Sequence, residues 1–195
     1  MIVNGNRVNK KAPAREKTLK STLKSRVIRV VSRPGRPDKG WVTLGNIQIP
    51  VALGRAGIRH LKREGDGATP AGTWHARGVR YRADHGGRPL TRLPVRRTRR
   101  EDGWCDAPGH GCYNRPVRLP FSASHEEMWR ADGLYDLVVV LDHNERPRRG
   151  RGGSAVFLHL ARPGFEPTAG CIAFRRADMK RLLARLTPRT RIKVG

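Results

Sequence analysis

Hydrophobic residues occur in short runs that glycine, proline and charged residues separate, a pattern typical of a chain built mainly from strands. Two neighbouring runs flank Gly45-Asn46 and predict a hairpin. The predicted strands cover residues 26–31, 41–44, 47–53, 135–142, 155–160 and 191–194. We therefore expect a mainly β fold with short helices, arranged as a mixed β-barrel or sandwich.

Two segments carry helical signals. Residues 177–186 repeat apolar side chains at three- and four-residue intervals, which predicts an amphipathic helix. Residues 124–132 predict a second, shorter helix, with Ser124 as N-cap and Glu127 completing a capping box. Met128 and Trp129 are expected to form its apolar face.

Residues 1–25 are basic and polar and show no apolar periodicity, so we expect a flexible N-terminal tail before a domain spanning 26–195. The start lacks the apolar stretch of a signal peptide. No run approaches the roughly 20 apolar residues that a membrane-spanning helix needs.

The chain carries 41 Lys and Arg against 16 Asp and Glu, a formal net charge of +25. Such a charge attracts polyanions, including nucleic acid, anionic cell-wall polymer and membrane surfaces. The basic residues are spread along the chain, and the aromatic residues are scattered rather than interleaved with them. A polyanion-binding protein is therefore a distant alternative, and we expect no specific nucleic-acid partner.

Candidate chemistry lies in residues 159–174. His159 ends an apolar run, and the Gly170-Cys171 pair follows a Pro/Gly-containing loop. A thiol with a pKa of about 8.5 needs a base, which an imidazole supplies. Backbone N–H groups near Ala169 and Gly170 would form an oxyanion hole. We expect a helix just past the cysteine, whose N-terminal partial charge would favour the thiolate.

This segment resembles the YkuD-type L,D-transpeptidase family, in which a strand-borne histidine precedes a Ser/Thr-His-Gly-Cys block. The corresponding residues here are Thr168-Ala169-Gly170-Cys171, with Ala169 in place of the family's histidine and Ala173 in place of its usual Arg or Asn. Residues 65–72 look like the family's Thr-Pro-x-Gly element. The resemblance extends over residues 26–195 and points to a divergent proteobacterial branch.

The resemblance implies a peptidoglycan L,D-transpeptidase with Cys171 as nucleophile and His159 as base. A thioester with one stem peptide would be resolved by the amine of another, giving a 3–3 cross-link or a variant such as 1–3. Water in place of the amine would make the protein an L,D-carboxypeptidase or amidase. The resemblance also implies acylation by carbapenem-type β-lactams and a periplasmic location. We expect no cofactor, and the histidines lack metal-ligand spacing.

Four residues are expected to contact substrate. Thr168 adjoins the cysteine, Arg175 would replace the missing positive group, and Tyr113 and Asn114 would be polar contacts in the donor cleft.

The loop at 109–114 also contains a His-Gly-Cys sequence ending at Cys112. Cys112 is not the expected nucleophile, because no strand-borne histidine precedes it at a suitable distance and no helix and terminal strand follow it in the family's order. Cys105 and Cys112 could form a disulfide in an oxidising compartment, and the sequence leaves this open.

Overall fold

The structure is a computed structural model that describes Met1 and residues 27–195. Apart from Met1, the predicted N-terminal tail lies outside these residues, as does Arg26.

Strands dominate the described chain, as the apolar pattern predicts. The strands are β1 (Val27–Arg33), β2 (Arg36–Leu44), β3 (Ile47–Ala52), β4 (Ile58–Arg59), β5 (Thr69–Pro70), β6 (Gly72–Tyr81), β7 (Val95–Arg97), β8 (Asp102–Cys105), β9 (Arg115–Arg118), β10 (His125–Glu127), β11 (Leu137–Leu141), β12 (Phe157–Leu160), β13 (Ile172–Phe174) and β14 (Arg191–Val194). The helical elements are the 3-10 turn η1 (Pro163–Phe165) and the helix α2 (Arg176–Leu183).

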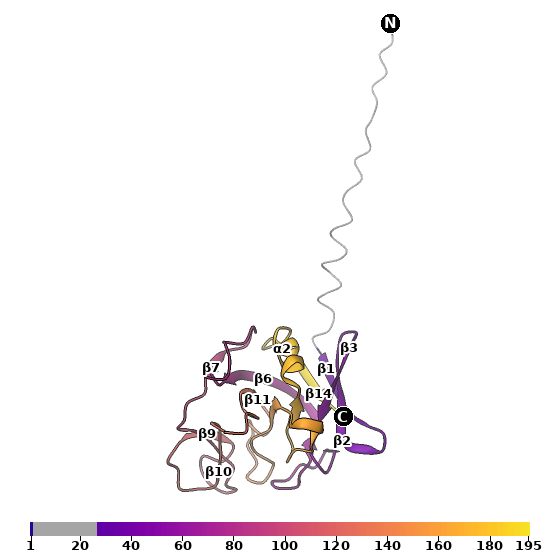
Figure 1. The fold of residues 1–195 in the computed structure, drawn as a ribbon. Coiled ribbons are helices and arrows are strands. Elements are labelled where there is room, and N and C mark those ends of the chain that lie inside the picture. The colour runs from indigo at the N-terminus through magenta and orange to yellow at the C-terminus, as the bar shows by residue number, and fades with distance from the viewer. Residues whose placement is uncertain (2–26) are drawn as a thin grey trace.

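Eight strands form a closed barrel in the order β11-β12-β13-β3-β2-β1-β14-β6, because β6 also pairs with β11. β7 extends the sheet beyond β6, and β10-β8-β9 form a separate small sheet. Figure 1 shows this small sheet below the barrel strands β6 and β11. The expectation of a mainly β, barrel-like fold is confirmed.

The predicted hairpin is β2–β3, where Leu44 pairs with Ile47 across the two-residue turn. Gly45 adopts a φ of 61°, a left-handed conformation that glycine enters without a Cβ penalty. The predicted C-terminal helix is α2, which ends a turn earlier than expected. Its buried side chains are Met179, Leu182 and Leu183. They pack with inward residues of the strands and fill the barrel interior.

A second apolar core lies outside the barrel, between its β11–β12 face and the small sheet. Its members are Trp104, Met128, Tyr135, Val138, Ala155, Phe157 and Cys171. Strand alternation explains the division, since Phe157 faces this outer core while Leu158 faces the interior. The outer core positions the candidate nucleophile.

Two helix predictions are wrong. Residues 125–127 of the predicted helix at 124–132 form β10, where Glu126 pairs with Trp104 of β8. Pairing with this strand outweighs the local capping signal, because it satisfies backbone groups and buries Met128 completely. The chain after Cys171 is the strand β13, and α2 begins only at Arg176.

Within the described residues, no helix is both long enough and apolar enough to cross a membrane.

Candidate active site

Cys171 lies directly before β13, with its thiol held by the backbone that leads into β12. The N–H of Phe157 donates to Sγ at 3.3 Å. The thiol donates to the carbonyl oxygen of Ala155 at 3.1 Å. The residue is 9% exposed. The nucleophile candidate is therefore fixed by two backbone contacts at the edge of the outer core.

His159 lies on the same face of the sheet as Cys171. It pairs with Ala173 across the parallel β12–β13 ladder, and Ala173 is two residues beyond the cysteine. Side chains two residues apart on a strand share a face. His159 is buried, and its Nδ1 lies 2.8 Å from the carbonyl oxygen of Leu160. A proton on Nδ1 makes this bond and leaves Nε2 as the basic atom.

Burial sets the protonation state of both groups. It raises the pKa of the Cys171 thiol to about 12, with a further rise from the nearby Glu126 and opposing effects of the Phe157 N–H and Lys62. It lowers the pKa of His159 to about 4, against the hydrogen bond to Leu160. The resting pair at neutral pH is therefore a thiol and a neutral imidazole. This differs from the expected thiolate at a helix N-terminus.

The turn before Cys171 is fastened by Thr168. Its hydroxyl donates to the Cys171 carbonyl at 2.7 Å and accepts the Gly170 N–H at 3.1 Å. The Gly170 N–H, an expected oxyanion donor, is thus already engaged. Among the described residues, the N–H groups of Ala169 and Cys171 have no hydrogen-bond partner. These two donors are the ones available to an oxyanion.

Gly170 adopts a φ of 149°, and a Cβ there would lie 2.8 Å from the Ala68 carbonyl oxygen. The residue thus permits a close approach between the cysteine turn and the Gly-rich segment at 65–72. The predicted need for glycine beside the cysteine has this physical basis.

Lys62 brings a positive charge to the site that the sequence analysis missed. Its side chain is 7% exposed, and its ammonium donates to Asp66 at 2.5 Å. The Ala68 N–H also donates to Asp66, which ties this ion pair to the segment that packs on Gly170. The charge of Lys62 favours ionisation of Cys171. The available signal was a lysine four residues before an aspartate in the Gly-rich segment.

Tyr135 and Glu126 form a second missed group. The Tyr135 ring packs edge-on against His159, with a centroid distance of 5.4 Å, and its hydroxyl donates to Glu126. Burial raises the pKa of Glu126, and burial together with the negative charge that Cys171 would carry as a thiolate raises that of Tyr135. The hydroxyl therefore stays protonated and the ring fixes one side of the imidazole.

Comparison of the sequence with known protein families identifies the class of enzyme to which this domain is related. Residues 24–194 match the YkuD family, described as the L,D-transpeptidase catalytic domain. The chain belongs to this family. Searches of curated proteins and of solved structures found no match. The recognition of a YkuD-type L,D-transpeptidase domain from the sequence is confirmed over nearly the whole chain.

In this L,D-transpeptidase domain, Asn114 is fully occupied by internal hydrogen bonds. Its Oδ1 accepts the indole N–H of Trp104 and the N–H of Ala155, both at 3.1 Å. Its Nδ2 donates to the carbonyls of His143 and Asn144. Asn114 thus anchors the backbone whose carbonyl holds the Cys171 thiol, which gives it a positioning role.

The other expected substrate contacts are also engaged. The Tyr113 hydroxyl donates to Glu64 at 2.5 Å, and the residue is 2% exposed. Arg175 is exposed, with its guanidinium 5.0 Å from the Phe165 ring centroid. Their contact with substrate stays a prediction. Cys105 and Cys112 are both free thiols in this structure.

Proposed function

We propose that this domain forms peptidoglycan cross-links by acyl transfer through Cys171, with His159 as base. Family membership supports the class of reaction, since YkuD domains act on peptidoglycan stem peptides. The observation that carries the assignment is the placement of Cys171 and His159 on one sheet face. Nδ1 of His159 is held by a carbonyl, and Nε2 has no hydrogen-bond partner among the described residues.

The first step begins from the neutral pair. Nε2 of His159 takes the Cys171 proton as sulfur attacks the carbonyl carbon of the third stem residue. The Leu160 carbonyl then holds the imidazolium that results. Proton transfer and attack belong together, because a free thiolate in this buried setting is costly.

The tetrahedral oxyanion is stabilised by the N–H groups of Cys171 and Ala169. Donors that point at the developing charge before reaction need no reorganisation during it. When the intermediate collapses, the imidazolium gives its proton to the leaving D-alanine amine and a thioester remains. The hydrogen bond from the Gly170 N–H to the Thr168 hydroxyl holds the turn that carries the Ala169 and Cys171 N–H groups.

An amine from a second stem then attacks the thioester and releases the cysteine. The diaminopimelate side chain as acceptor gives a 3–3 link, and a different acyl donor position gives a 1–3 link. Such a substrate places the enzyme in the periplasm. Carbapenem-type β-lactams, which present a strained carbonyl to the same thiol, are expected to acylate it.

The test is product analysis after incubation with purified disaccharide-tetrapeptide stems. Cross-linked dimer from wild type and from Cys112→Ala, but not from Cys171→Ala, supports the proposal. Trimmed stems without dimer would assign the site to an L,D-carboxypeptidase instead. Equal product from Cys171→Ala and wild type would overturn the nucleophile assignment.

A further inference from the structure

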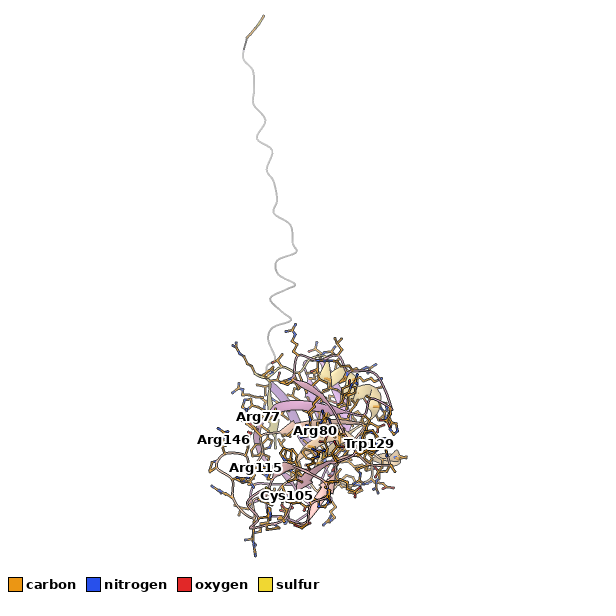
Figure 2. The ribbon with its side chains drawn as sticks, turned by 90° about the vertical axis from the view of Figure 1, so that its left-hand side faces the viewer. Arg77, Arg80, Cys105, Arg115, Trp129 and Arg146 are labelled. Atoms are coloured by element: carbon orange, nitrogen blue, oxygen red, sulfur yellow. The ribbon has the colours of Figure 1, made fainter. Side chains whose placement is uncertain are left out.

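A cavity of about 550 Å³ opens beside β6, β7 and β11, and Trp104, which belongs to the same apolar core as Cys171, forms part of its wall. Six arginines line it: Arg77, Arg80, Arg96, Arg115, Arg146 and Arg148. Figure 2 shows Arg77, Arg146 and Arg115 following one another along one edge of the domain, with Arg80 nearer its centre. Cys171 and His159 are not among its lining residues.

The arginines outnumber the carboxylates that could neutralise them. Arg77 pairs with Glu145 at 2.6 Å. Arg96 and Arg80 share one carboxylate, Asp102, at 2.7 and 3.5 Å. Arg115 and Arg146 form no ion pair with any carboxylate in the described chain. The cavity therefore carries an excess of positive charge.

Arg80 makes the cavity more than a stretch of basic surface. Its side chain is 11% exposed, and its buried Nη1 lies 3.5 Å from an oxygen of Asp102 without a hydrogen bond to any described residue. Burial, and then the charge of Arg96, lowers its pKa. Because Arg80 shares its carboxylate with Arg96, the positive charge at this end of the cavity is only partly neutralised. His143 also lines the cavity, and its buried Nδ1 has no hydrogen-bond partner in the part of the chain that the structure describes.

Apolar groups form the other part of the lining. Trp104, Pro94, Pro116 and Val140 contribute to it beside the guanidinium groups. A guanidinium presents a planar fork that matches carboxylate and phosphate oxygens. Apolar and aromatic walls with a few placed polar groups are typical of small-molecule sites.

We propose that this cavity binds a small ligand that carries a carboxylate or phosphate group on an apolar, ring-sized body. Arg115 and Arg146 contact the anionic group at the rim, Arg80 contacts it from below, and the ring lies against Trp104. The proposal does not depend on the proposed transpeptidase activity, because the site is formed without Cys171 and His159.

The site shares a wall with the candidate active site. Trp104 packs edge-on against Phe157 at 5.1 Å, and the N–H of Phe157 donates to Cys171 Sγ. Trp104 also donates to Asn114, which holds Ala155. Binding is therefore expected to perturb Trp104 directly and to leave the opposite end of the barrel unchanged.

The experiment is a nuclear magnetic resonance titration of the full chain with phenyl phosphate, benzoate and the neutral benzyl alcohol. We expect saturable shifts at the indole N–H of Trp104 and at the N–H of Gly78, which also lines the cavity, with at least one anion and none with the alcohol. The anion with the lower dissociation constant shows whether the cavity prefers phosphate or carboxylate. No saturable shift with either anion would overturn the proposal.

Two double variants that remove the same charge distinguish binding in the cavity from attraction of the anion by the net charge of the protein. Arg115→Gln with Arg146→Gln should raise the dissociation constant of the preferred anion about tenfold. Arg185→Gln with Arg189→Gln removes the same charge from exposed positions outside the cavity and should change it less than about twofold. Equal weakening in both would show that net charge alone attracts the anion and would overturn the site.

Discussion

The thiol of Cys171 donates its hydrogen to the backbone carbonyl of Ala155, with Sγ 3.1 Å from the oxygen. This bond and the burial of the sulfur hold the proton on the candidate nucleophile. The N–H of Ala155 is itself fixed by Asn114. A buried backbone segment thus keeps Cys171 protonated in the resting state, and the thiol loses its proton only when substrate is bound and His159 accepts the proton.

Stability should depend on pH through His159. Its pKa is about 4 in the folded state, against about 6.5 in an unfolded chain. Between these values the unfolded chain binds a proton that the folded protein does not, so stability falls as the pH is lowered from 6.5 to 4. The loss amounts to about 3 kcal/mol when complete.

Urea unfolding at pH 7.5 and 4.5 measures this effect. His159→Gln should lose less stability on acidification than wild type, while the exposed control His60→Gln should behave as wild type does. The same acid sensitivity in His159→Gln and wild type would show that His159 does not titrate in this way.

Lys62 should govern how readily Cys171 ionises. Lys62→Met removes a charge that lowers the thiol pKa, so alkylation of Cys171 by iodoacetamide at pH 9 should slow by about three- to tenfold. Peptide-level mass spectrometry reads Cys171 separately from the other two cysteines. Arg63→Met removes an exposed neighbouring charge and should leave the rate near that of wild type. Equal slowing in both variants would count against a local role of Lys62.

Asn114→Ala should destabilise the fold by about 2–4 kcal/mol, because it leaves two N–H groups and two carbonyls without their partner. The left-handed φ of 52° adds to the cost for alanine. Asn46→Ala, in the exposed turn of the β2–β3 hairpin, should stay within about 0.5 kcal/mol of wild type. Urea unfolding compares the two. A KM effect in Asn114→Ala without loss of stability would favour the substrate-contact prediction over the positioning role.

The strands could be predicted because their signals are local, and the cysteine–histidine pair was singled out mainly by the resemblance to the YkuD family. Alternation in Phe157-Leu158-His159-Leu160 assigns one face to the barrel interior and the other to the site. The same alternation is present after Cys171, where Ile172 and Phe174 face inward. The helix expected there conflicted with a strand signal that the sequence already contained.

The rest depends on contacts between distant segments, which no local pattern encodes. The capping box at Ser124 fits a helix, yet residues 125–127 pair with β8. Lys62 reaches the cysteine turn only because the Gly-rich segment packs against Gly170. The occupied state of Asn114 likewise requires knowledge of where Ala155 and Trp104 lie.

The most direct test of the central claim is mass spectrometry of the acid-quenched protein during turnover of a tetrapeptide stem. We predict a mass increase equal to the mass of the tetrapeptide stem minus that of free D-alanine, located on the peptide that contains Cys171. It should persist in Cys112→Ala and be absent in Cys171→Ala. An adduct on Cys112, or one that survives in Cys171→Ala, would contradict the assignment of Cys171 as the nucleophile.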